Sequence, residues 1–114
     1  MGFPRTRMRR LRRTGAIRDM CAETDLSRND LIMPLFALPG EDREEEVHSL
    51  PGVYRHSVDR LQQRCRSLTP PAVLLFGVPD EDAKDARASS ALDADGIVPR
   101  ALRAIRSQRE DLCL

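Results

Sequence analysis

The sequence is poor in aromatic residues and has no long apolar run. Aromatic residues make up 4% of its 114 positions, and tryptophan is absent. No apolar segment approaches the roughly 18–20 residues that span a bilayer, and the N-terminus lacks the apolar stretch of a secretory signal. These absences predict a soluble, cytoplasmic protein that makes no membrane contact.

Cysteine and histidine are also scarce. Cys21, Cys65 and Cys113 lie too far apart for a CxxC metal knuckle or a secreted disulfide framework. Each is expected to behave as a small hydrophobic side chain, with Cys113 inside a strand. His48 and His56 cannot form an i, i+4 ligand pair on one helix, so both are expected in polar loops. We therefore assign no metal ligand in this sequence.

Charge is divided unevenly along the chain. The formal net charge is +1, yet seven arginines precede the first acidic residue, Asp19. From Asp19 onward there are 12 basic and 18 acidic residues. The first 18 residues are thus a basic stretch on an otherwise acidic chain. They lie within a predicted extended arm, residues 1–30, that precedes the body, residues 31–114. Such an arm can bind phosphates, but the lack of interleaved aromatic residues argues against nucleic acid as a partner.

Two apolar runs and two amphipathic segments predict an α/β fold. The nearly continuous apolar runs at 31–38 and 72–78 are typical of parallel strands with both faces covered. Apolar residues at helical spacing predict helices over 58–68 and 97–105. Residues 111–114 read as the start of a third strand. Strand and helix alternate about every 40 residues, which is typical of right-handed crossovers in a parallel sheet.

The segments between these elements are expected to be less regular. One or two helical turns are predicted around 16–23, within the arm. The acidic segment 41–46 is expected to be a solvated loop, because consecutive carboxylates cannot converge on a metal. Asp95 is the predicted N-cap of the second helix.

Five different short motifs follow one another along nearly the whole chain. They are Arg7-Met8-Arg9-Arg10-Leu11-Arg12-Arg13, Asp30-Leu31-Ile32-x-Pro34-Leu35-Phe36, Ser49-Leu50-Pro51-Gly52-Val53-Tyr54-Arg55, Leu75-Phe76-Gly77-Val78-Pro79 and Asp95-Gly96-Ile97-Val98. By these motifs the chain resembles the N-terminal third of the porphobilinogen synthase (5-aminolevulinate dehydratase) family.

The resemblance implies a fold and an activity. The fold would be α/β: an N-terminal arm plus the first two βα units of a (βα)8 TIM barrel, incomplete and truncated at the start of strand 3. Family members condense two 5-aminolevulinate molecules to porphobilinogen in tetrapyrrole (heme) biosynthesis, using Schiff bases on two lysines and, in the full-length enzymes, zinc and/or magnesium. The arm would join copies into a homo-oligomer, often an octamer, through Arg7, Arg9, Arg10, Arg12 and Arg13.

The resemblance implies few site residues within this chain. The Schiff-base lysines would lie beyond Leu114. Lys84, the one lysine present, lies among acidic residues and is expected to form a solvated ion pair. Phe76 would contact substrate, although filling the barrel interior explains an aromatic residue there equally well. Ala88 stands where the family usually has glycine.

Two interpretations of the whole chain follow. In the first it is an N-terminal fragment of the enzyme and is inactive alone, because the required lysines are absent. In the second it is a non-catalytic oligomerisation or interaction fragment. A basic-arm nucleic-acid binder is a further, weaker alternative.

Overall fold

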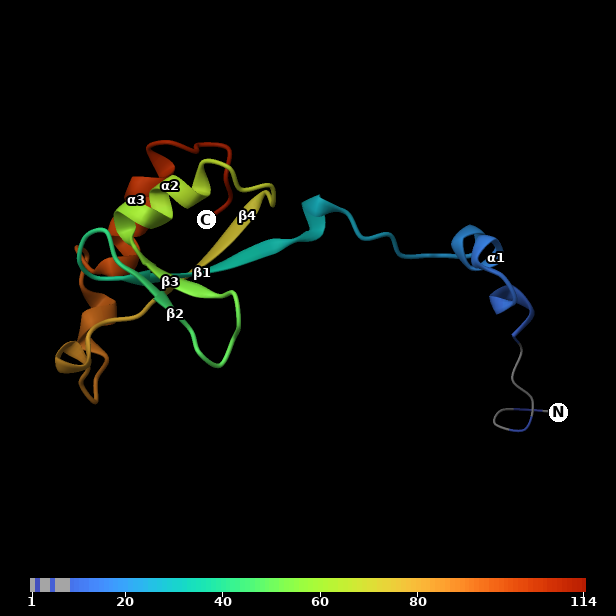
Figure 1. The fold of residues 1–114 in the computed structure, drawn as a ribbon, viewed down its shortest axis with the longest axis horizontal. Helices are drawn as coiled ribbons and strands as arrows, with labels where there is room; N and C mark the ends of the chain where they lie inside the picture. Colours follow the sequence, from blue (N-terminus) through green and yellow to red (C-terminus); the bar gives the residue numbers. More distant parts are fainter. Residues whose placement is uncertain (1, 3–4, 6–8) are drawn as a thin grey trace.

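The computed structural model describes residues 2, 5 and 9–114 (Figure 1). An extended arm leads into a body built from one sheet and one layer of helices, and the longest dimension is 63 Å. The elements in chain order are η1 (Arg10–Arg12), α1 (Gly15–Met20), η2 (Arg28–Asp30), β1 (Ile32–Leu38), β2 (Glu44–Glu46), β3 (Tyr54–Ser57), α2 (Val58–Cys65), β4 (Ala72–Gly77), η3 (Glu81–Ala83), η4 (Ser89–Leu92) and α3 (Ile97–Arg106), where η denotes a 3₁₀ helix.

The sheet is mixed and has the strand order β2-β3-β1-β4. β1 pairs in parallel with β4, from Ile32 opposite Ala72 to Ala37 opposite Gly77. On its other edge β1 pairs in parallel with β3, and β2 runs antiparallel to β3. The pairing with β3 begins only at Phe36, so one edge of β1 is open beside Pro34, which is compatible with a proline in this strand. The two predicted strands and the parallel crossover between them are confirmed.

The hairpin of β2 and β3 was not predicted, and the expectation of a loop over 41–46 is wrong in part. Glu44–Glu46 forms the outer strand of the sheet. The tight turn over 50–53 returns the chain, with the Val53 amide donating to Leu50 O at 3.0 Å. Charged residues are common on edge strands because they deter pairing with other chains. The composition of an edge strand such as Glu44–Glu46 is therefore similar to that of a solvated loop.

His56 corrects a second expectation. It lies in β3 and is only 4% exposed, whereas His48 lies in the exposed turn as predicted. Its Nε2 faces the Glu44 carboxylate at 3.3 Å. Burial, and then the positive charge of Arg64, lower the pKa of His56, while Glu44 opposes the shift and Arg60 adds to it. Folding therefore favours the neutral imidazole.

The helices follow the predicted pattern with shifted ends. α2 ends at Cys65, earlier than expected, and α1 spans Gly15–Met20, which overlaps the predicted 16–23 region but begins one residue earlier. α3 begins at Ile97 with Gly96 as its N-cap, and not Asp95. Asp95 instead forms an ion pair with Arg103 at 2.9 Å.

The core lies between the sheet and the layer of α2 and α3, which cover one face of the sheet in Figure 1. Alternate strand residues point into it, because side chains alternate across a strand. The buried residues of this core are Leu35, Ala37, Leu61, Cys65, Val73, Ala101, Ile105 and Leu112.

The other face of the sheet is apolar and exposed. Ile32, Leu74 and Phe76 are 63%, 52% and 44% exposed. In the described residues helices pack on one side of the sheet only, and exposure of the other face is what we expect of an unclosed sheet of two βα units. Continuous apolar strands of this kind normally have a second covering layer.

The C-terminal residues lie beside β4, where a further parallel strand would start. Cys113 makes an isolated parallel bridge with Ala72, and the Val73 amide donates to Cys113 O at 2.8 Å. The Cys113 side chain is exposed, as is that of Cys21, so neither is the buried hydrophobic residue expected; only Cys65 is buried. Within the described residues, no helix is long and apolar enough to cross a bilayer.

His56 makes stability depend on pH. A lowered folded-state pKa means that, below about 6.5, the unfolded chain binds a proton more readily than the folded one. The free energy of unfolding should therefore fall as pH decreases from 7 toward 5, and His56→Gln should flatten this dependence. Urea unfolding at several pH values tests it. His48→Gln is the matched control and should keep the wild-type slope; equal slopes in all three proteins would contradict the burial effect.

Candidate functional site

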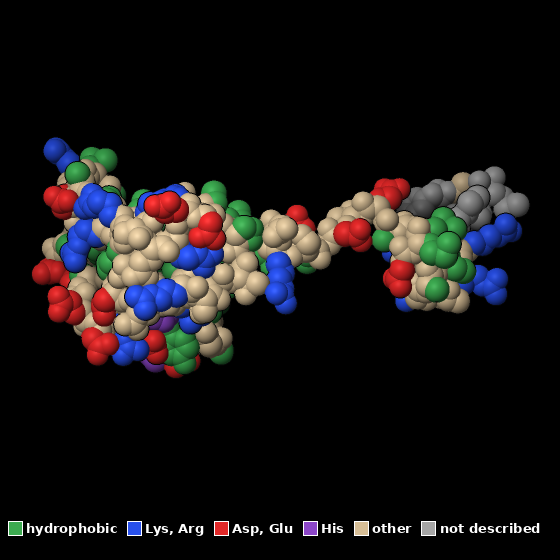
Figure 2. Space-filling model, turned by 90° about the horizontal axis from the view of Figure 1, so that it is seen from above, with side chains coloured by type: hydrophobic (Ala, Val, Ile, Leu, Met, Phe, Trp, Pro, Cys, Tyr) green, Lys and Arg blue, Asp and Glu red, His purple; other side chains and the backbone are tan. Residues whose placement is uncertain are grey.

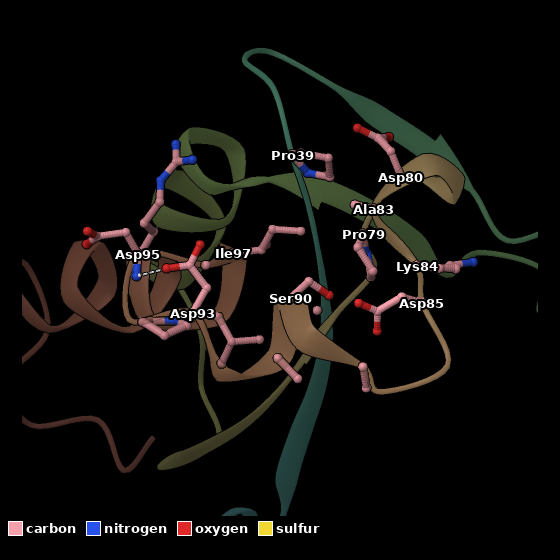
Figure 3. Close-up of a pocket in the computed structure, with 17 residues that line it drawn as sticks. Pro39, Pro79, Asp80, Ala83, Lys84, Asp85, Ser90, Asp93, Asp95 and Ile97 are labelled. Atoms are coloured by element: carbon pink, nitrogen blue, oxygen red, sulfur yellow. Dashed lines mark hydrogen bonds between the residues drawn. The ribbon is translucent and has the colours of Figure 1, made fainter.

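A cleft of about 790 Å³ opens at the carboxyl ends of β1 and β4 (Figure 3). Pro39 follows β1, Gly77 ends β4 and Pro79 follows it, and all three line the cleft. The remaining lining comes from the segment 80–96 and the first turn of α3. Ligand sites of α/β folds lie at this edge, because the loops after parallel strands converge there.

Gly77 sets the distance between β4 and α3. A Cβ added at this position would lie 2.8 Å from Cγ2 of Val98, which is closer than nonbonded carbon atoms approach. Only glycine lets the end of the strand and the start of the helix meet without displacement. This contact brings the first turn of α3 to the edge of the sheet, where it forms one wall of the cleft.

Asp85 organises the loop that forms the opposite wall. Its Oδ1 accepts hydrogen bonds from the backbone amides of Arg87 at 3.0 Å and Ser89 at 2.9 Å. These bonds, that from Ser89 first, lower the pKa of Asp85. Between the two donors the chain turns through Ala88, which has a left-handed φ of 51°. The carboxylate thus holds a turn with a geometry that suits glycine better than alanine.

Asp93 and Arg103 fix the end of the same loop. The Asp93 carboxylate accepts a hydrogen bond from the Asp95 amide at 2.9 Å, which is the dashed line in Figure 3. Arg103 donates to Ala94 O at 3.1 Å as well as pairing with Asp95. Four aspartates line this cleft: Asp80, Asp85, Asp93 and Asp95. The last three of them stabilise its walls, through hydrogen bonds to backbone amides or the ion pair with Arg103.

Lys84 lines the cleft but does not point into it. Its ammonium is paired with Glu81 and is directed away from Asp85 in Figure 3. The predicted ion pair is confirmed. An imine-forming lysine is activated by burial or by a neighbouring cation, whereas the Lys84 side chain is exposed and lies beside a carboxylate.

Phe76 lies on the sheet face opposite the helices and does not line the cleft. Its ring stacks against that of Phe36, with centroids 5.5 Å apart and planes at 27°, and the two residues are opposite each other in the β1–β4 register. Phe36 was not singled out from the sequence, although its place in the first apolar run was a sufficient signal. The two rings form an aromatic platform next to the cleft.

The described residues bring no metal site together. In residues 2, 5 and 9–114 there is no group of three or more His, Cys, Asp or Glu side chains able to hold an ion. Cys65, the one buried thiol, has its pKa raised by burial, which disfavours the thiolate that binds metals. The donor set of this part of the chain therefore does not fit zinc.

Arm and body differ in how their arginines are held. Arg9, Arg10, Arg12 and Arg13 are exposed, and Figure 2 shows the arm projecting from the body, whereas Arg7 lies outside the described residues. In the body, Arg43 ties the hairpin to the end of β1 and to the loop after β4. The sequence did not lead us to single out Arg43. The feature that could have indicated it is that Arg43 is the one basic residue inside the acidic segment 41–46.

The left-handed turn at Ala88 predicts a stabilising substitution. Ala88→Gly removes the Cβ crowding of a positive φ and should raise the free energy of unfolding by up to about 1 kcal/mol, net of the larger entropy of glycine in the unfolded chain. Chemical denaturation measures the difference. The matched control is Ala91→Gly in η4, which has no positive φ to relieve and should not stabilise; a gain at both positions would show that the turn geometry is not the cause.

Comparison with known proteins supports one family throughout the chain. The family described as "ALAD: Delta-aminolevulinic acid dehydratase" matches residues 5–114. The delta-aminolevulinic acid dehydratase of Methanothermus sociabilis is 40% identical over 122 aligned positions, which cover 100% of this chain and 38% of the relative. That of Synechocystis sp. is 45% identical over 113 positions, covering 96% of this chain and 34% of the relative.

A solved structure agrees with the sequence comparisons. The delta-aminolevulinic acid dehydratase (porphobilinogen synthase) of Toxoplasma gondii, in complex with the reaction product porphobilinogen, superposes with a TM-score of 0.79 at 31% identity. The match covers 94% of this chain and 31% of that one. The chain spans about a third of the length of these relatives, and it belongs to the delta-aminolevulinic acid dehydratase, or porphobilinogen synthase, family.

Proposed function

We propose that this chain is the N-terminal third of a porphobilinogen synthase, the part that carries the arm and the first two βα units of a (βα)8 barrel. The observation that carries the proposal is the family match over residues 5–114, together with coverage of only 38% and 34% of two relatives. The whole enzyme, in the cytoplasm, would condense two 5-aminolevulinate molecules to porphobilinogen for tetrapyrrole synthesis.

In this proposal the aromatic platform of Phe36 and Phe76 is the chain's contribution to the substrate pocket. Phe76 is the penultimate residue of β4, and its half-exposed ring lies on the sheet face that a complete barrel would enclose. A stacked pair offers a rigid apolar surface that excludes water from one side of a small substrate. Polar recognition and bond making would fall to residues outside this chain.

The catalytic lysines and metal ligands are proposed to lie outside residues 1–114. Lys84 is held by Glu81 and points away from the cleft, which argues against an imine there. The described residues gather no three metal ligands, so any zinc or magnesium of the enzyme would be bound elsewhere. The isolated chain is therefore proposed to be inactive.

A chimera tests the proposal directly. Replacing the matching 113 positions of the Synechocystis relative by this chain should give an enzyme that forms porphobilinogen from 5-aminolevulinate. Phe76→Ala in the chimera should raise KM about tenfold through the lost aromatic contact. Steady-state kinetics with colorimetric detection of porphobilinogen measures both.

Two controls accompany the chimera. Leu92→Ala removes an 87% exposed side chain and should leave KM unchanged. The 114-residue chain by itself should form no porphobilinogen, because its one lysine is in an ion pair. Product from the isolated chain, or a folded but inactive chimera, would refute the proposed role.

A second candidate function is an interaction fragment, and the projecting arm favours it. The described arm arginines are exposed and carry the charge that could dock on carboxylates of another subunit (Figure 2). In this function the arm would join a homo-oligomer, with Arg7 contributing beside the other four.

Co-purification tests this function. The tagged chain should capture the full-length Synechocystis relative at micromolar concentration, and replacement of Arg9, Arg10, Arg12 and Arg13 by serine should abolish capture. Arg64→Ser with Arg66→Ser, two exposed arginines in the last turn of α2 and at its C-cap, is the control and should leave capture intact. No capture by the wild-type chain would contradict the function, whereas salt-sensitive DNA retention lost on removal of residues 1–18 would favour a nucleic-acid binder.

A further inference from the structure

Arg43 is anchored by its backbone before its side chain makes any contact. Its amide donates to Ser57 Oγ at 3.0 Å, and its carbonyl accepts the Ser57 amide at 2.9 Å. The Ser57 hydroxyl also donates to the Arg43 carbonyl at 3.3 Å. Ser57 is fully buried at the junction of β3 and α2, so the base of the Arg43 side chain is fixed relative to the body.

The guanidinium of Arg43 then spans three segments of the sheet edge. One terminal nitrogen donates to Pro39 O, just past β1, at 3.0 Å and lies 3.7 Å from the Asp80 carboxylate, just past β4. The other terminal nitrogen donates to Glu45 of β2 at 2.6 Å. Arginine is suited to this task because its planar fork offers several donors in fixed directions.

Gly40 leaves room for this side chain. It has a φ of 95°, and a Cβ added there would lie 2.9 Å from Cδ of Arg43. Both the backbone conformation and the space favour glycine. The path of the chain after β1 is therefore shaped around the arginine as well as around the turn itself.

The contacts of Arg43 begin where the backbone pairing of β1 and β4 ends. The Val78 amide donates to Ala37 O at 2.8 Å, and beyond it the described hydrogen bonds include no further backbone link between the two segments. Pro39 and Asp80 both line the cleft, on the segments that separate after this point. In Figure 3 they lie beside each other at one side of the cleft.

We propose that Arg43 is a positioning residue that clasps Pro39 to Asp80 and so sets the separation of the segments after β1 and β4 at the cleft. The proposal rests on the proposed function only in taking this cleft as part of the active site. It also gives the hairpin of β2 and β3 a role toward the cleft, through the bond of Arg43 to Glu45. The hydrogen bond to Glu45 is the largest of the causes that raise the pKa of Arg43, and the charge of Asp80 adds to it. The guanidinium therefore keeps its charge, and the clasp is not lost by deprotonation.

Amide hydrogen exchange in the 114-residue chain tests the clasp. Arg43→Gln should accelerate exchange of the Val78, Ala83 and Lys84 amides, which are hydrogen-bonded in the segment after β4, by about two- to fivefold, the range expected for loss of partly exposed charged contacts. Arg43→Lys keeps one charge without the fork and should give an intermediate value. NMR measures these amides individually in the absence of substrate.

A double substitution identifies the partner. If Arg43 acts through Asp80, the same three amides should exchange no faster in the double variant Arg43→Gln with Asp80→Asn than in Arg43→Gln alone. The matched control, Arg66→Gln, removes an exposed hydrogen bond to Gln108 just past the ends of α2 and α3 and should leave the three amides unchanged. Unchanged exchange in Arg43→Gln, fully additive effects, or equal acceleration throughout α2 and α3 would each overturn the proposal.

This outcome is independent of the proposed reaction. Exchange is measured without 5-aminolevulinate, so an inactive chimera would refute the enzymatic role and leave the clasp to be judged on exchange alone. Conversely, an active chimera with unaltered exchange in Arg43→Gln would refute the clasp and preserve the enzymatic role.

Discussion

The parallel pairing of β1 with β4 is the contact on which the rest of the body depends. It fixes six residue pairs in register and so decides which side chains of both strands share a face. One face receives α2 and α3 through Leu61, Ala101 and Ile105, all essentially without exposed surface. A slip of one residue would turn the buried side chains outward, so burial and register support one another.

The same register produces two different surfaces. Toward the helices it gives a closed core, and on the other side it aligns Phe36 with Phe76 on an open apolar face. Large exposed apolar surfaces are uncommon on complete soluble domains. The open face is consistent with a chain that covers about a third of its relatives' length, because closure of a barrel brings the interior side chains of all its strands together.

The cleft depends on local chemistry at the end of these strands. Gly77 allows α3 to approach β4, Asp85 holds the turn through Ala88, and Arg43 bridges the segments after β1 and β4. Each contact is modest and partly exposed. Together they convert two strand ends into a wall of defined shape, so the geometry of the cleft rests on polar contacts while its location rests on the apolar core.

The sequence by itself determined the two long strands, both body helices, the ion pair of Lys84 and the family, because apolar periodicity and ordered motifs are local properties. It did not reveal β2 and β3, the burial of His56, or the exposure of Cys113. Edge strands of charged residues resemble loops, and whether a histidine is buried depends on partners such as Glu44 and Arg64 from other elements. Only the tertiary structure decided the Phe36–Phe76 platform and the reach of Arg43, since both join segments that the sequence separates.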